Sequence, residues 1–128
     1  MPPIFLMILI FISSSIPMQQ DDEQLKFLSR LNSTIQNVLH VPLYGFLSYL
    51  WLKSFVNTNF SMSNKISLTL AITLLYGFFD EFHQTFIPGR YGCITDVVFN
   101  SSGIVLGIIV FCLFKSKKNG KAYKAGRL

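Results

Sequence analysis

Three long apolar stretches and one shorter one dominate the hydrophobic pattern of the chain. Residues 38–56, 66–87 and 96–114 are each apolar over their main run, without the alternation that predicts a strand. A helix needs about 20 apolar residues to cross a bilayer, so each stretch predicts a membrane-spanning helix. The shorter run, residues 4–17, fits either a signal peptide or a first span. Because Met1–Leu6 contains no basic residue, we favour a retained first helix in a locally thinned bilayer.

The composition supports this interpretation. The 128 residues are 51% hydrophobic and 13% charged, which is about half the charged fraction of a typical soluble domain. Thirteen Phe exclude an intrinsically disordered chain, and two Cys are too few for a disulfide scaffold. The sequence therefore predicts an all-α, four-helix transmembrane bundle over residues 1–114, followed by a basic tail over residues 115–128.

The net charge of +5 is located in that tail. Residues 115–128 contain six Lys and Arg and no acid, so the basic balance does not indicate a nucleic-acid partner. By the positive-inside rule the tail is cytoplasmic, and four spans place the N-terminus on the same side. The first and third connections, residues 18–37 and the loop around Arg90, are then expected outside.

Polar residues interrupt the third apolar stretch near its outer end. At about 100° per residue, Asp80, His83 and Gln84 lie on one helix face, with Glu81 at its edge. The helix is expected to end at Pro88-Gly89, since proline has no amide hydrogen to donate. The next residue, Arg90, then lies in the outer loop beside these side chains.

The second and fourth helices bring further polar residues to the same depth. Asp96 and Asn100 share a face of the fourth helix with the small-residue seam Gly103-x-x-x-Gly107, along which another helix can approach closely. His40 lies at the outer end of the second helix, and Tyr44, one turn later, is expected to be a packing residue. The predicted ligand-binding site at the outer leaflet therefore consists of His40, Asp80, Glu81, His83, Gln84, Arg90, Asp96 and Asn100.

A purely structural role for these residues is the alternative. Pairs of Arg90 with Asp96 and of His83 with Asp80 could hold the bundle together, and Asn100 could link two helices by hydrogen bonds. One or two such pairs would be enough for that purpose, whereas ionisable residues inside a membrane more often mark a functional site. We therefore favour a site over a set of staples.

The polar residues of the third helix form part of a longer motif, Tyr76-Gly77-x-x-Asp80-Glu81-x-His83-Gln84-x-Phe86-x-Pro88-Gly89-Arg90. With Asp96 and Asn100-x-x-Gly103, His40-x-x-x-Tyr44-Gly45 and Ser14-Ser15-Ile16-Pro17, this motif resembles the signature of the VanZ-like family of small bacterial membrane proteins. The resemblance covers roughly residues 5–112. One departure is that Gln36-Asn37 stand where members often carry an Asp-Lys pair, which puts a role for that pair in doubt.

The resemblance implies a multi-pass protein of the bacterial inner (cytoplasmic) membrane. The family's namesake is associated with resistance to the glycopeptide teicoplanin, so a link to glycopeptide resistance is an expectation at the level of the family. The partners expected are membrane lipids and either a lipid-linked cell-wall component or a glycopeptide. The oligomeric state is left open, and an oligomer is compatible with the sequence.

Three functions are compatible with the residues. The first is a protein that binds or modifies envelope components, in which Arg90 and the two His hold an anionic group and the acids meet an amine or a hydroxyl. The second is an intramembrane enzyme that acts on an envelope lipid, with His83 as a base oriented by Asp80 and with Glu81 as an acid. The third is a proton-coupled transporter, which the lack of an inverted repeat disfavours. We favour the first, and expect neither a metal nor a cofactor because the sequence contains no metal-binding spacing such as HExxH.

Overall fold

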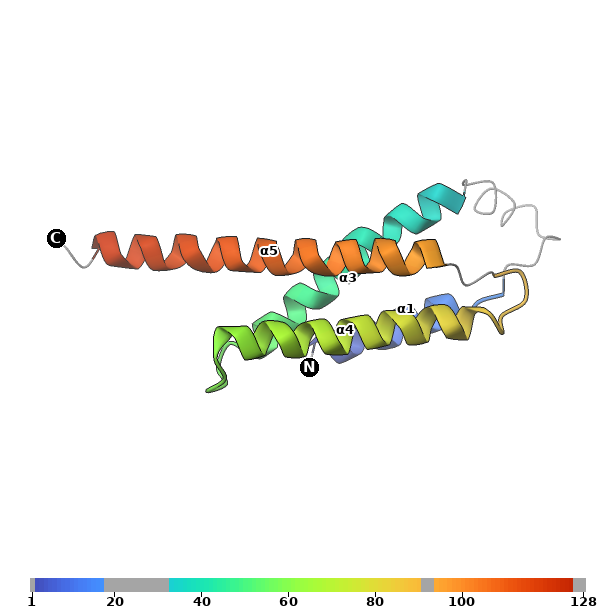
Figure 1. The fold of residues 1–128 in the computed structure, drawn as a ribbon, viewed down its shortest axis with the longest axis horizontal. Helices are drawn as coiled ribbons and strands as arrows, with labels where there is room; N and C mark the ends of the chain where they lie inside the picture. Colours follow the sequence, from blue (N-terminus) through green and yellow to red (C-terminus); the bar gives the residue numbers. More distant parts are fainter. Residues whose placement is uncertain (1, 18–32, 91–93, 126–128) are drawn as a thin grey trace.

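The computed structural model describes residues 2–17, 33–90 and 94–125, and these ranges contain four helices and no strand. The helices are α1 (Pro2–Ser14), α3 (Ser33–Ser54), α4 (Met62–Gln84) and α5 (Ile94–Ala125) (Figure 1). The all-α class and the four predicted helices are therefore confirmed. Most of the two predicted outer connections, residues 18–32 and 91–93, lies outside the described residues.

The helix boundaries differ most from the predicted ones at the start of α3 and the end of α5, and α4 ends at Gln84, before the predicted stop at Pro88-Gly89. α3 begins at Ser33 and runs through Pro42 without a break in the helix, although the predicted stretch began at residue 38. α5 continues to Ala125, into the residues expected to form the tail. Lys and Ala, which are frequent in this segment, have a high helix propensity.

Local sequence signals explain both ends of α4. At its start, the Ser61 hydroxyl accepts a hydrogen bond from the Asn64 amide at 3.2 Å and thereby caps the helix. After Gln84 the chain leaves the helix through a turn in which Gly89 has a φ of 79°, a left-handed conformation that favours glycine. This turn sends Arg90 back towards the bundle.

The helices alternate in direction along the chain. In Figure 1, α4 and α5 run antiparallel, α3 crosses α5, and α1 follows α4. The C-terminal ends of α1 and α4 and the N-terminal ends of α3 and α5 therefore meet at one end of the bundle, which we call the polar end. At 13 residues, α1 is about 20 Å long, and it packs along the C-terminal half of α4.

Glycines allow α3 and α5 to cross in close contact. The α hydrogens of Gly103 and Gly107 face the backbone carbonyls of Val41 and Gly45, and a β-carbon at either glycine would overlap them. The Ser48 hydroxyl lies 3.0 Å from the carbonyl oxygen of Ile104 across this crossing. The small-residue seam predicted from the sequence is therefore confirmed, and α3 is the helix that packs on it.

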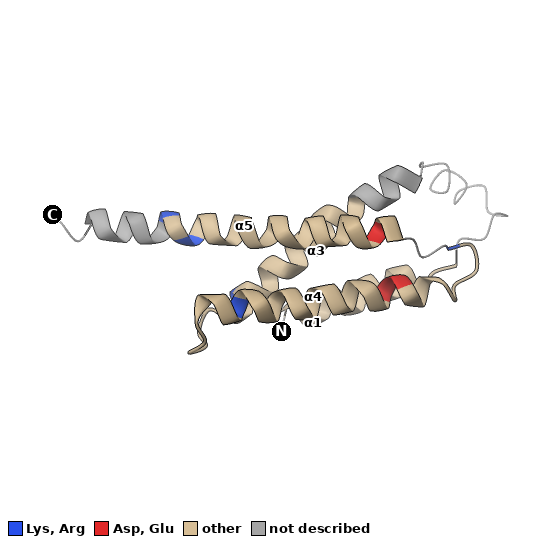
Figure 2. Ribbon diagram, viewed as in Figure 1, with Lys and Arg blue, Asp and Glu red and all other residues tan. Residues whose placement is uncertain are grey.

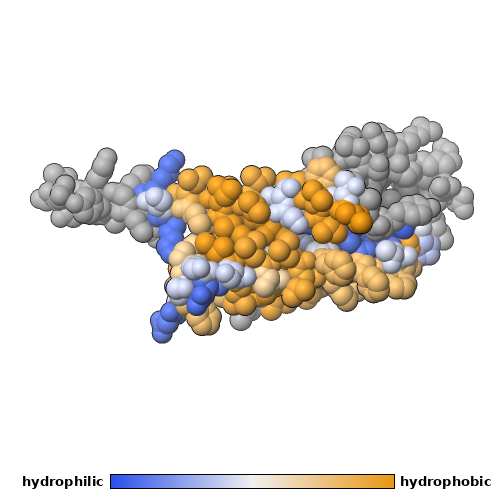
Figure 3. Space-filling view, viewed as in Figure 1, coloured by the Kyte–Doolittle hydropathy of each residue, from blue (hydrophilic) through white to orange (hydrophobic). Residues whose placement is uncertain are grey.

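The polarity of the bundle is inverted relative to a soluble protein. Large apolar side chains are exposed on all four helices, and Leu75 (71%), Phe78 (64%) and Phe114 (63%) are examples. In the same bundle Asp80 is 1% exposed and Asn100 is 2% exposed. Figure 3 shows the resulting apolar surface, which extends over the face presented by α4 and α5. Soluble monomers rarely expose apolar patches of this extent.

Among the described helices, one meets the length and apolarity expected of a membrane span when it is considered alone. This is α5 over Ile94–Lys117, whereas α1 is apolar but shorter. The four-span prediction is therefore not established by hydropathy. In α4 the polar residues that lower the hydropathy, such as Thr69, Thr73 and Asp80, are buried in the bundle rather than exposed on its surface.

We expect the Gly107→Val substitution to destabilise the fold by about 3 kcal/mol or more, because the added side chain overlaps the Gly45 carbonyl and the Ser48 hydroxyl. Ser102→Val is the matched control, since it places the same side chain on the exposed face of α5 and should change stability by no more than about 0.5 kcal/mol. Thermal unfolding of the two purified variants measures the difference. Equal melting temperatures would show that the α3–α5 crossing does not depend on close contact.

Candidate functional site

Asp80 connects three helices at the polar end. The Ser14 hydroxyl of α1 donates to Asp80 Oδ1 at 2.7 Å, and Gln84 Nε2 donates to Oδ2 at 3.1 Å. The Tyr44 hydroxyl of α3 lies 3.5 Å from the same oxygen. Both carboxylate oxygens are therefore supplied with donors from the protein, which is what a buried carboxylate requires. These contacts give Asp80 a role in holding α1, α3 and α4 together.

His83 lies against α1 rather than against Asp80. Its ring stacks on Phe11 with 4.6 Å between the ring centroids, and its Nε2 is 3.1 Å from the Ser15 hydroxyl oxygen. Because Ser15 uses its own proton to bond the Phe11 carbonyl at 2.7 Å, His83 Nε2 must be the donor in this contact. The geometry thus does not bring together the predicted pair of a His83 base oriented by Asp80.

Arg90 also contacts α1. Its Nε donates to the Ile16 carbonyl at 3.2 Å and its Nη2 to the Ser13 carbonyl at 2.9 Å. A cation at a helix C-terminus is favoured by the helix dipole and satisfies carbonyls that have no partner within the helix. Partial burial lowers the pKa of Arg90, and the nearby carboxylates of Asp80 and Glu81 oppose this shift. The alternative staple of Arg90 with Asp96 is therefore replaced by a cap on α1.

A second set of predicted residues links α3, α4 and α5. Asn100 Nδ2 donates to Glu81 Oε1 at 3.3 Å, and Asn100 Oδ1 lies 2.9 Å from His40 Nδ1. With the amide nitrogen directed at Glu81, the amide oxygen accepts from His40, so the His40 proton is on Nδ1. A neutral His40 then carries its lone pair on Nε2.

Asp96 differs from Asp80 in its partners. It lies in the first turn of α5, one helical turn before Asn100 and on the same face, and is 7% exposed. It interacts electrostatically with His40. Within the described part of the chain, no hydrogen-bond partner reaches its buried Oδ1. A buried acceptor without a donor costs about 1–3 kcal/mol, and is therefore uncommon in a native structure.

The eight predicted residues thus separate into two groups. Those that bind α1 or Asp80 form what we call the anchor group, which contains Asp80, His83, Gln84 and Arg90. The others form what we call the open group, which contains His40, Glu81, Asp96 and Asn100. In the ranges that the structure describes, no three His, Cys, Asp or Glu side chains are placed to hold a metal ion.

Three hydroxyl residues that contact the anchor group were not predicted as site residues. Ser14 and Ser15 come from the last turn of α1 and the residue after it, and Tyr44 is fully buried with its hydroxyl directed at Asp80. The signal for the serines was their position in the motif at the end of an otherwise apolar helix. Tyr44 was interpreted as a packing residue, which its burial supports, but its hydroxyl is also a contact of Asp80.

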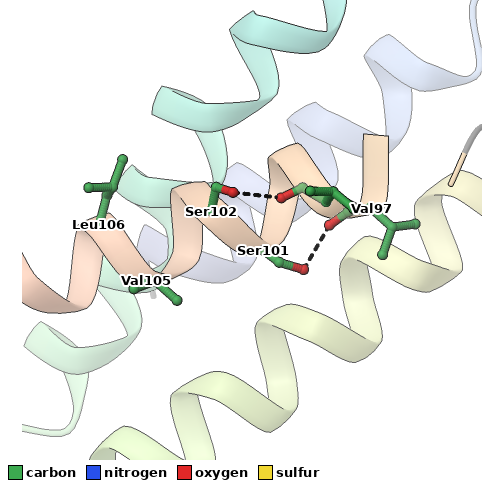
Figure 4. A pocket seen from close by; sticks show the side chains of 6 residues that line it. Val97, Ser101, Ser102, Val105 and Leu106 are labelled. Atoms are coloured by element: carbon green, nitrogen blue, oxygen red, sulfur yellow. Dashed lines mark hydrogen bonds between the residues drawn. The ribbon is translucent and has the colours of Figure 1, made fainter. Parts of the chain in front are cut away.

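A shallow groove on α5 lies apart from both groups. Its volume is about 570 Å³, and its lining residues are Val97, Val98, Ser101, Ser102, Val105 and Leu106 (Figure 4). The hydroxyls of Ser101 and Ser102 donate to carbonyls of their own helix. At about 100° per residue the groove lies on the face of α5 opposite Asp96 and Asn100, so it is not an entrance to the open group.

We expect the two isosteric substitutions Asp80→Asn and Asp96→Asn to have different effects on stability. Asp80→Asn places an amide nitrogen among three donors and should cost about 2–4 kcal/mol, as the loss of hydrogen bonds to a charged group does. Asp96→Asn removes a buried charge whose Oδ1 has no described partner, so the melting temperature should stay equal or rise. Thermal unfolding of the purified variants decides. A large loss for Asp96→Asn would show that Asp96 belongs to the structural contacts.

Comparison with known proteins gives one match. The VanZ/LLP1 family model matches residues 2–115. This range contains both groups of polar residues and the α3–α5 crossing. No curated protein and no solved structure matches the chain significantly.

Proposed function

The chain belongs to the VanZ/LLP1 family, and we propose that it is a multi-pass protein of the bacterial cytoplasmic membrane that binds the polar part of a cell-envelope component. The single observation that carries this proposal is that the two buried aspartates differ in the hydrogen-bond donors that reach their carboxylate oxygens. Asp80 receives its donors from the protein, whereas Asp96 Oδ1 lacks one among the described residues. An external hydrogen-bond donor would complete the open group.

The inverted polarity supports a location in the membrane. Exposed apolar side chains on every described helix suit contact with lipid, and buried polar side chains such as Asp80, Gln84 and Asn100 bond to one another or to other side chains, as is required where water is absent. The helices alternate in direction, so that the family's range folds as an antiparallel bundle. In a bilayer, each helix of such a bundle would cross or enter the hydrocarbon region.

The distribution of charge supports an orientation. Figure 2 shows the acids of α4 and α5 at the polar end and the basic residues of these helices towards the opposite end. At that opposite end, Lys65 of α4 donates to the carbonyls of Val56 and Thr58. Lys115 and Lys117 lie in the C-terminal part of α5. By the positive-inside rule this basic end is cytoplasmic. The polar end and its open group would then lie in the outer leaflet.

We expect fusion reporters to place the C-terminus in the cytoplasm and Arg90 on the outer side of the membrane. Green fluorescent protein fused after Leu128 should fluoresce, whereas alkaline phosphatase fused there should be inactive. Alkaline phosphatase fused after Arg90 of a truncated chain should be active, because that residue ends the third span. Active phosphatase after Leu128 would reverse the orientation and put the open group on the cytoplasmic side.

We expect Asp96→Asn to remove the cellular function while the protein remains at its normal level in the membrane. The family's association with glycopeptide resistance makes susceptibility to teicoplanin the first readout, measured in cells with and without the gene. Asp80→Asn is the contrasting variant, since it should lower membrane abundance as well. Normal susceptibility with Asp96→Asn, at normal abundance and against a measurable wild-type effect, would remove Asp96 from the functional site.

An intramembrane enzyme is the second candidate, and the contacts of the open group favour it. Asn100 donates to Glu81, which orients the Asn100 amide so that its oxygen accepts the Nδ1 proton of His40. The Nε2 atom of a neutral His40 is then available to take a proton. His40, rather than the sequence-predicted His83, would then be the base. In that case His40→Ala would abolish a change in the envelope lipids, detected by mass spectrometry of extracts, whereas a binding protein would leave the lipid composition unchanged.

A further inference from the structure

We infer that the group bound by the open group is a primary ammonium, an inference that rests on the proposed binding function. The proposed function requires a donor for Asp96 but does not specify its charge. The charges and the donors around Asp96 narrow the choice among an anion, a neutral hydroxyl and a cation.

The balance of charge at the polar end favours a cation. The structure buries three carboxylates here, those of Asp80, Glu81 and Asp96. The nearby guanidinium of Arg90 directs two of its N–H groups to carbonyls of α1 rather than to a carboxylate. Buried carboxylates need a compensating positive charge more than they need a further anion. A lipid phosphate, which would be repelled by Asp96, is therefore a poor fit to the open group.

The arrangement of acceptors favours a primary ammonium over a hydroxyl. Asp96 Oδ1 is buried and lacks a described hydrogen-bond partner, so it is an acceptor that a ligand can use. A primary ammonium brings to the Asp96 carboxylate both a positive charge and N–H donors, whereas a hydroxyl brings one donor and no charge. A quaternary ammonium has the charge but no N–H.

The depth of Asp96 makes such a group reachable. Asp96 is in the first turn of α5, and Ile94 at the start of that helix is 84% exposed. The open group thus lies close to the end of the bundle rather than at its centre. Two sources present a primary ammonium at that level, the ethanolamine headgroup of a lipid and a soluble amine.

Thermal unfolding of the full-length protein in detergent tests this inference, because a ligand that binds the folded state raises the melting temperature. The probes are short-chain phosphatidylethanolamine, phosphatidylcholine and phosphatidylglycerol with identical acyl chains, together with free ethanolamine. We expect phosphatidylethanolamine to bind at least about tenfold more tightly than phosphatidylcholine, because the methylated nitrogen cannot donate to Asp96. Asp96→Asn should abolish this preference, and Ser102→Ala, on the opposite face of α5, should preserve it.

The other outcomes are distinguishable. Preference for phosphatidylglycerol, or equal binding of the three lipids, would overturn the ammonium inference and leave envelope binding standing. A preference for phosphatidylethanolamine that survives Asp96→Asn would overturn the assignment to the open group. Stabilisation by free ethanolamine to the same extent would keep the ammonium and identify a soluble amine as the ligand. No stabilisation by any probe would count against both the ammonium and the proposed binding function.

Discussion

The buried carboxylate of Asp80 is the constraint on which the polar end of the bundle depends. A carboxylate that is 1% exposed must receive donors, and it receives them from Ser14, Tyr44 and Gln84. These donors belong to three helices, so satisfying one side chain fixes how α1, α3 and α4 approach each other. The same packing positions part of the open group, because His40 belongs to α3 and Glu81 to α4.

Residues of the same types serve different purposes in the two groups. Asp80 and His83 direct their hydrogen bonds to α1, whereas Asp96 and His40 lie between α3 and α5. The two groups differ in whether their buried carboxylate oxygens have hydrogen-bond donors. A residue that only holds helices together should have no acceptor without a donor, whereas a binding residue can retain one at a cost in stability. The predicted residues therefore do not form one uniform set: the anchor group holds α1 in place, and the open group is the part that we propose as the site.

The sequence predicted the helices, the common depth of the polar residues and the glycine seam, because each depends on spacing along one helix. It did not predict the partners, because spacing defines a face but not the side chain that faces it. His83 was paired with Asp80 by proximity in sequence, yet in the fold it lies on Ser15 and Phe11. Arg90 was expected to meet an anion or Asp96, but the left-handed turn at Gly89 directs it to the end of α1.

The short length of α1 explains why the anchor group is so large. Thirteen residues give about 20 Å of helix, less than the roughly 30 Å of a bilayer core, so α1 has less surface to pack than the other three helices. Polar contacts make up for this: Tyr76 donates to the Met7 carbonyl at 2.6 Å, and Arg90 and Ser14 fasten the other end. The motif residues that a short first helix requires are then structural. The site that we propose falls to the remaining polar residues, which are His40 of α3, Glu81 of α4, and Asp96 and Asn100 of α5.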